Sequence, residues 1–149
     1  MTGPTWISDG SPIDDPFGYG ERAVKFLRLL KHPKSRAPGK AFQLDPWQER
    51  IVRRIYGPAH EVGRRKTRVV YLQVGRGNRK TSLGAVLALL HTFGPERIPG
   101  GQVLSAAADR KQARIAYDEA MAIVAAVPQL AAKAQPQDFK NRLTHTTSK

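Results

Sequence analysis

Strand-like and helix-like sequence meet in the stretch Val69-Val-Tyr-Leu-Gln-Val-Gly-Arg-Gly-Asn-Arg-Lys-Thr-Ser-Leu83. Its first part is apolar and β-branched, which predicts a strand over residues 67–74. Gly75 and Gly77 then interrupt the apolar run, and a helical pattern begins at Lys80. A strand, a glycine-rich turn, a Lys-Thr pair and a helix form the layout of a phosphate-binding loop, in which backbone N–H groups and a helix N-terminus face an anion.

The loop departs from the common phosphate-loop pattern at two positions. In G-x-x-x-x-G-K-[ST] the glycines would stand at 74 and 79, but this sequence has Val74 and Arg79. Arg79 places a side chain where glycine normally lets the backbone approach a ligand closely. The residues alone therefore allow two interpretations, a nucleotide site or a basic turn that joins a strand to a helix.

The composition favours a polyanionic partner. Lys and Arg number 25 against 12 Asp and Glu, a formal net charge of +13 over 149 residues, and such an excess suits DNA, RNA or nucleotide phosphates. Between Arg50 and Lys80 the only acid is Glu61. The absence of cysteine excludes disulfides, thiolate metal sites and cysteine nucleophiles. With no signal peptide and no apolar run long enough to span a bilayer, we expect a cytoplasmic protein without a membrane partner.

Helical spacing of apolar residues and capping signals predict the flanking elements. Residues 1–18 are rich in Gly, Pro, Ser and Asp and are expected to be a flexible lead-in. Asp45 suits an N-cap, and Gln48 stands where a capping box places Glu or Gln. Asp109 and Gln112 form the same pattern. Helices are expected over 21–32, 46–56, 80–93, after Asp109 and over 129–137, and residues 141–147 are either an edge strand or a frayed end.

A second strand is expected over residues 102–107, after two glycines. Strand–helix–strand–helix order with crossovers of this length implies a parallel pair with right-handed connections. The turn after residues 67–74 would then lie at the carboxyl edge, where open α/β sheets bind ligands. We therefore expect an α/β fold with a short parallel sheet and flanking helices, preceded by two N-terminal helices.

Four side chains could carry chemistry in such a site. Lys80 would contact the outer phosphates, and the hydroxyl of Thr81 would reach Mg²⁺. Arg76 would contact a γ-phosphate as an arginine finger does, or it is a surface charge. Gln48 caps its helix or reads an adenine edge. The run that ends in Asp118-Glu119 superficially resembles a strand with two catalytic acids, but its helical period predicts that both acids face solvent.

From about Gly20 to the end, the sequence resembles the N-terminal part of a large terminase subunit, the DNA-packaging ATPase of tailed bacteriophages and prophages. The resemblance rests on five ordered blocks, which are residues 23–32, 39–48, 55–57, 75–82 and 101–113. It implies ATP and Mg²⁺ as cofactors, an adenine contact from Gln48, a metal contact from Thr81 and catalytic roles for Arg76 and Lys80. Members of the family usually have glycine in place of Arg79. The full set of implied nucleotide-binding residues is Gln48, Gly75, Arg76, Gly77, Asn78, Arg79, Lys80, Thr81 and Ser82.

The resemblance also sets the expected function. Residues 19–149 would be the N-terminal portion of an incomplete P-loop NTPase domain, because the family's Walker B strand and nuclease domain have no counterpart here. We expect nucleotide binding with little or no hydrolysis by this chain alone, in the cytoplasm of a bacterial host. The implied partners are double-stranded DNA, the small terminase subunit and the portal. Two alternatives stay open, a basic nucleic-acid-binding module with a degenerate phosphate loop and a non-functional prophage remnant.

Overall fold

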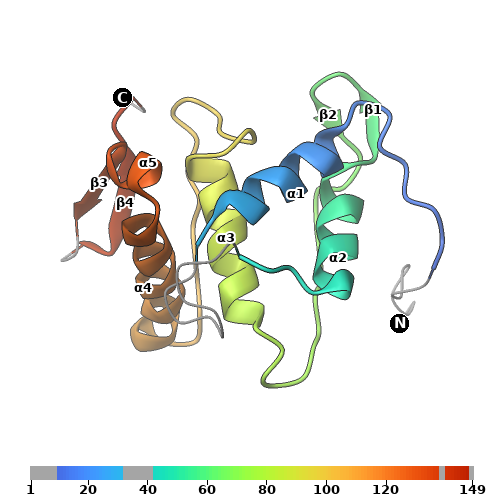
Figure 1. The fold of residues 1–149 in the computed structure, drawn as a ribbon. Helices are drawn as coiled ribbons and strands as arrows, with labels where there is room; N and C mark the ends of the chain where they lie inside the picture. Colours follow the sequence, from blue (N-terminus) through green and yellow to red (C-terminus); the bar gives the residue numbers. More distant parts are fainter. Residues whose placement is uncertain (1–9, 32–41, 138–139, 148–149) are drawn as a thin grey trace. The chain divides into compact units, whose positions relative to one another are not determined.

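The computed structural model describes residues 10–31, 42–137 and 140–147. Within them the chain forms helices and two short hairpins (Figure 1). It divides into two compact units. The first unit comprises Met1–Val24 and Leu44–Leu72, and the second comprises Lys25–Gln43 and Gln73–Lys149. In chain order the elements are α1 (Tyr19–Leu29), α2 (Pro46–Tyr56), β1 (Ala59–Glu61), β2 (Arg64–Arg65), α3 (Lys80–Thr92), α4 (Arg110–Ala126), α5 (Pro128–Ala131), β3 (Ala134–Gln137) and β4 (Arg142–His145).

The first unit is organised by α2 and the start of α1. As the sequence predicts, α2 begins after Asp45, whose backbone N–H donates to Oε1 of Gln48 at 3.1 Å. The helix ends at Gly57, whose N–H donates to the carbonyl of Arg53 at 2.8 Å. Its buried side chains are Gln48, Ile51, Val52 and Tyr56.

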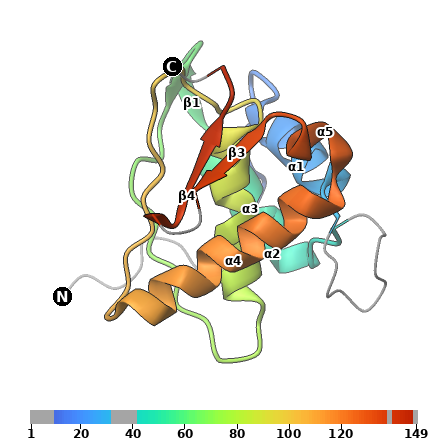
Figure 2. The ribbon, with the colours of Figure 1, turned by 90° about the vertical axis from the view of Figure 1, so that its left-hand side faces the viewer.

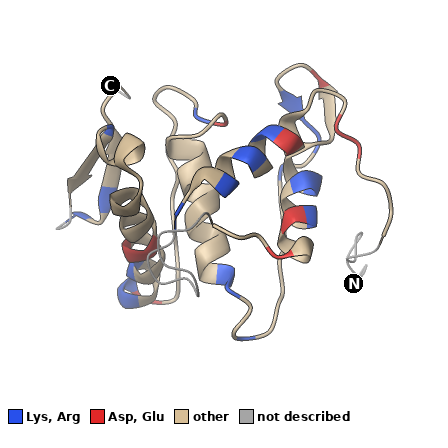
Figure 3. Cartoon of the chain, viewed as in Figure 1, with Lys and Arg blue, Asp and Glu red and all other residues tan. Residues whose placement is uncertain are grey.

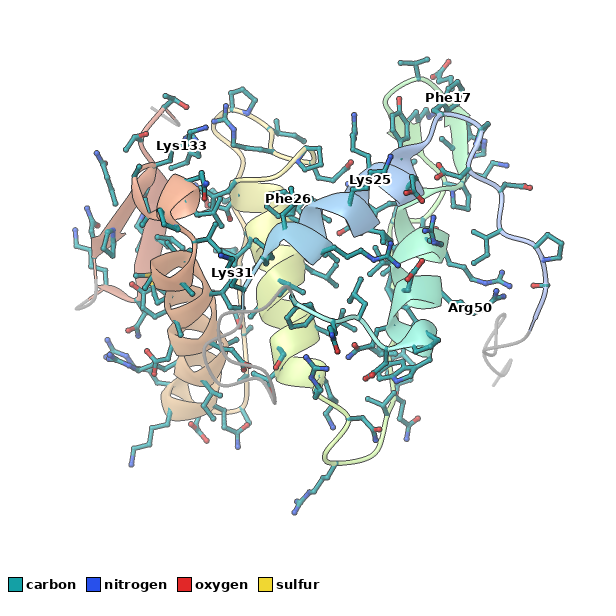
Figure 4. All side chains as sticks on the ribbon, in the orientation of Figure 1. Phe17, Lys25, Phe26, Lys31, Arg50 and Lys133 are labelled. Atoms are coloured by element: carbon teal, nitrogen blue, oxygen red, sulfur yellow. The ribbon has the colours of Figure 1, made fainter. Side chains whose placement is uncertain are left out.

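Polar contacts fix the segment that precedes α1. The carboxylate of Asp15 accepts hydrogen bonds from the backbone N–H groups of Gly20 and Glu21, at 3.1 and 2.9 Å, and so caps the helix. Arg50, labelled in Figure 4, extends from α2 and donates to the carbonyl of Ser11 at 2.8 Å. Residues 11–15 therefore make specific contacts within the first unit, whereas residues 1–9 lie outside the described part.

The second unit is built on the packing of α3 against α4, and Figure 2 shows α4 lying across α3. The predicted N-cap of α4 is confirmed, because the Asp109 carboxylate accepts from the backbone N–H of Gln112 at 2.9 Å. Both helices bury one apolar face. The buried residues are Leu83, Ala85, Val86, Leu89 and Leu90 on α3 and Ala120, Ile123 and Val124 on α4.

After α4 the structure differs from the expected helix over 129–137. A single helical turn ends at Ala131, and β3 then pairs antiparallel with β4, with Ala134 opposite His145. Pro136 explains the change, because proline inside a helix removes a hydrogen bond and clashes with the preceding turn. The strand alternative for residues 141–147 is confirmed. Burial, with the charges of Arg97 and Lys133, lowers the pKa of His145 below its ordinary range.

The two strands predicted over 67–74 and 102–107 are not strands in this structure. Both segments are non-helical and pair with no strand among the described residues. Several of their apolar side chains are exposed, with Val69 88% and Leu104 86% accessible. The apolar pattern of a segment indicates a preference for extended backbone, but it does not identify a second segment to pair with. A β-strand requires such a partner. The mixed α/β class is correct, whereas the described sheets are two antiparallel pairs, β1–β2 and β3–β4, and a parallel sheet is not confirmed.

The described residues include no helix with the length and apolar character needed to cross a bilayer.

Gly57 gives a test of the first unit's packing. A Cβ added there would lie 2.6 Å from the backbone carbonyl oxygen of Asp14, so the chain would have to shift. We expect Gly57→Ala to lower the free energy of unfolding by about 1–3 kcal/mol, measured by urea denaturation. Gly84→Ala is the matched control, because its Cβ meets nothing within 4 Å. Inside α3 that change should stabilise by about 0.5–1 kcal/mol. Equal effects of the two substitutions would contradict the packing described for Gly57.

Candidate phosphate-binding site

The predicted phosphate loop, residues 75–79, leads directly into α3 in the second unit. Its backbone turns through two left-handed residues, Gly77 with φ of 81° and Arg79 with φ of 51°. The side-chain amide of Asn78 holds the turn together by donating to the carbonyls of Gly75 and Arg76, at 3.2 and 3.5 Å. The first N–H groups of α3 have no partner within the helix, and its N-terminus carries partial positive charge. The loop and helix therefore have the layout of an anion site.

Lys80 reaches back across this loop. Its Nζ donates to the backbone carbonyl of Val74 at 3.1 Å, so the side chain links the first residue of α3 to the residue that precedes the loop. The ammonium group is exposed. A phosphate oxygen would form a charge-assisted bond that is stronger than the bond to a neutral carbonyl. Lys80 is therefore held near the loop by a contact that an anion can replace.

Arg79 is the residue that breaks the glycine pattern, and its side chain is engaged outside the loop. Its guanidinium donates to the carbonyl of Gln43 at 3.2 Å and lies over the ring of Phe42, 5.0 Å from the ring centroid. All three residues belong to the second unit. Arg79 therefore lies in the loop, as predicted from the sequence, but its guanidinium contacts the segment that precedes α2 in sequence.

The first turn of α3 carries Thr81 and Ser82. Thr81 is exposed, as a metal-contacting hydroxyl would need to be. The hydroxyl of Ser82 instead donates to a carboxylate oxygen of Glu119 on α4. This corrects the expectation that both acids of Asp118-Glu119 face solvent. Asp118 is exposed and pairs with Arg114 at 3.4 Å, whereas Glu119 is half-buried. The sequence offers one signal for the half-buried position of Glu119, which is its place next to Ala120 on the buried face of α4.

Arg76 and Gln48 complete the predicted set. Arg76 is exposed on the turn of the loop. Gln48 belongs to the first unit, whereas the loop belongs to the second. Gln48 is fully buried, and its Nε2 has no hydrogen-bond partner among the described residues. The capping role predicted for its Oε1 is confirmed, and the amide nitrogen is left as an unused buried donor.

A metal site made only of protein ligands is not seen in the described part of the chain, where no three His, Asp or Glu residues gather. A single Thr hydroxyl suits Mg²⁺ that arrives with a nucleotide, because this ion keeps waters and takes phosphate oxygens as ligands. The donor set of the loop therefore fits a magnesium–phosphate ligand.

Comparison with known proteins identifies the class. The family of the terminase large subunit, ATPase domain, matches residues 46–147. This range includes the whole phosphate loop, α3 and α4, and the chain belongs to this family.

A particular relative is the large subunit of the terminase of Enterobacteria phage HK97. It is 34% identical over 113 residues, which are 74% of this chain and 21% of that protein. The crystal structure of the HK97 bacteriophage large terminase superposes with a TM-score of 0.73 at 28% identity. That superposition covers 85% of this chain and 25% of the HK97 chain. The chain thus spans about a fifth to a quarter of the length of the proteins it matches.

The contact between Ser82 and Glu119 makes a testable contribution to the second unit. We expect Ser82→Ala to leave the half-buried carboxylate without this donor and to lower the free energy of unfolding by about 1–3 kcal/mol, measured by urea denaturation. Thr81→Ala is the matched control on the same turn, because Thr81 is exposed, and its effect should stay within about 0.5 kcal/mol. A loss for Ser82→Ala no larger than that of the control would refute the contact.

Proposed function

We propose that this chain binds ATP with Mg²⁺ at residues 75–82 and is the nucleotide-binding part of a DNA-packaging motor. The observation that carries the proposal is the position of Lys80. It stands at the first residue of α3, directly after a glycine-containing turn, with its Nζ held across that turn by the carbonyl of Val74. Membership of the terminase ATPase-domain family supports ATP over other phosphate ligands.

Each loop residue has a distinct role in this proposal. The backbone N–H groups of the loop and of the first turn of α3 bind phosphate oxygens. Lys80 contacts the outer phosphates, and Thr81 contacts the metal ion. Mg²⁺ supplies neutralisation of phosphate charge. The exposed guanidinium of Arg76 is free to turn toward the terminal phosphate, which is the catalytic role proposed for it together with Lys80.

Gln48 is proposed to recognise adenine. Its Oε1 accepts from the Asp45 backbone at 3.1 Å, which fixes the orientation of the amide. Its buried Nε2 then remains as a donor without a described partner. A buried donor that lacks a hydrogen-bond partner is unfavourable, so a ligand acceptor at this position would form a hydrogen bond that removes this cost. The ring nitrogens of adenine are acceptors that a glutamine amide pairs with.

Hydrolysis by this chain alone is proposed to be weak. Phosphoryl transfer needs a carboxylate that holds the metal and a residue that positions the attacking water. Glu119, the acid in contact with the first turn of α3, is engaged by Ser82. We also propose that residues 67–74 and 102–107 become parallel strands in a complete ATPase domain, which would cover Val69, Tyr71 and Leu104.

Nucleotide affinity tests the proposal directly. We expect the purified chain to bind a fluorescent ATP analogue in the presence of Mg²⁺, and Lys80→Ala to weaken binding by about 10- to 100-fold, the range for a lost charge-assisted bond. Lys111→Ala is the matched control, because Lys111 is an exposed lysine in the first turn of α4. It should leave affinity within about twofold. Equal losses for the two variants, or no binding by the wild-type chain, would contradict a nucleotide site at the loop.

A second candidate function is nucleic-acid binding, and the hairpin β1–β2 favours it. Arg64 and Arg65 form β2, Lys66 follows directly, and Figure 3 shows basic residues at β2. Arg65 lies over the ring of Tyr56 at 5.2 Å, which holds its guanidinium in place. Double-stranded DNA is the partner that the terminase family suggests, and the small terminase subunit and portal are the protein partners expected by the same resemblance.

Salt dependence separates the two functions. We expect DNA affinity, measured by fluorescence anisotropy, to fall linearly on a logarithmic salt scale, with a slope that reflects the phosphates contacted. Alanine at Arg64 and Lys66 together should reduce that slope by about 2, whereas Lys80→Ala at the start of α3 should reduce it by less. DNA binding without any nucleotide binding would identify a degenerate loop. An unchanged slope in the double variant would exclude the β1–β2 hairpin as the DNA contact.

A further inference from the structure

The backbone of Arg79 has a conformation that arginine rarely adopts. Its φ and ψ of 51° and 31° place it in the left-handed region at the N-cap of α3. For a residue with a Cβ this conformation is disfavoured by about five- to thirtyfold in population, whereas glycine adopts it freely. Contacts made by the Arg79 side chain can offset this cost.

The interaction is provided by two consecutive residues, Phe42 and Gln43. The guanidinium lies 5.0 Å from the centroid of the Phe42 ring and donates to the Gln43 carbonyl at 3.2 Å. Phe42 is itself fixed, since it is 1% exposed and its backbone N–H donates to the carbonyl of Leu30 at 2.6 Å. A cation held at once by an aromatic face and a carbonyl is a two-point anchor. The anchor is therefore attached to the buried core of the second unit.

We propose that Arg79 is a positioning residue, which clamps the phosphate loop in its left-handed turn by anchoring its side chain on Phe42 and Gln43. Arg79 thereby maintains the backbone conformation for which glycine is usually needed. Glycine reaches this conformation because it lacks a Cβ, whereas Arg79 is held in it by its side chain. The guanidinium is not a phosphate ligand in this arrangement, because its described contacts lie outside the loop.

The clamp acts on the nucleotide through Lys80. Arg79 immediately precedes Lys80, so the left-handed turn sets the direction of the first N–H groups of α3. It also sets the path by which Nζ of Lys80 reaches the Val74 carbonyl at 3.1 Å. A loosened Arg79 would leave these groups present but disordered, and preorganised donors bind an anion better than mobile ones. This part of the inference rests on the proposed nucleotide function, whereas the clamp itself does not.

Hydrogen exchange of the full chain without nucleotide tests the clamp independently of any ligand. Arg79→Ala keeps the Cβ and removes the anchor, so the amide of Leu83, which donates to the carbonyl of Arg79 at 3.0 Å, should exchange about fivefold faster or more than in the wild type. Arg79→Gly removes the anchor and the Cβ together, and its exchange should be clearly slower than that of Arg79→Ala. Phe42→Leu should act in the same direction as Arg79→Ala and add little when combined with it.

Two results would overturn the clamp. One is exchange in Arg79→Ala that equals the wild type, and the other is exchange in Arg79→Gly that is as fast as in Arg79→Ala. Arg114→Ala, on the exposed face of α4, is the matched control for loss of an arginine.

Affinity for a fluorescent ATP analogue with Mg²⁺ then extends the test to the site. The clamp predicts that Arg79→Gly binds more tightly than Arg79→Ala. Equal losses in both variants, with unchanged hydrogen exchange, would make Arg79 a phosphate ligand and refute the proposal. If no variant and no wild-type chain binds the analogue, the proposed nucleotide function fails, and the order of exchange rates still decides whether the clamp exists.

Discussion

The packing of α3 against α4 is the interaction on which the candidate site depends. The loop is bonded covalently to the first turn of α3, and that turn is held by buried leucines and by the hydrogen bond from Ser82 to Glu119. Burial of each leucine side chain stabilises by about 1.5–3 kcal/mol, so the helix pair is far stronger than any contact inside the loop. In a phosphate site the donors must be in place before the anion arrives, and here the two helices provide that rigidity.

Charge and packing act on different parts of the function. The helix pair and the Arg79 anchor hold the loop in shape, whereas the excess of positive charge attracts phosphates in general. That charge by itself does not distinguish a nucleotide from a nucleic-acid backbone. The family match covers residues 46–147, whereas the loop geometry concerns a few residues within that range. The two are therefore separate observations that support each other.

The features predicted correctly from the sequence depend on neighbours along the chain. The caps at Asp45 and Asp109, and the helices that follow them, are local and were recognised from spacing. The contact from Arg79 to Phe42 and Gln43 joins residues far apart in sequence, and no periodic pattern records it. The strand predictions over 67–74 and 102–107 failed for a related reason. Alternation of apolar residues indicates what a segment prefers, but pairing depends on a second segment.

Those two extended segments have a consequence for the behaviour of the protein in concentrated solution. Val69, Tyr71 and Leu104 are more than four-fifths exposed, and extended backbone with apolar side chains is a template for pairing with another molecule. The net charge of +13 keeps molecules apart while electrostatic repulsion extends through the solvent. At an ionic strength near 1 M the screening length falls to about 3 Å. The ionic strength that would release DNA under the proposed nucleic-acid function would then also favour aggregation.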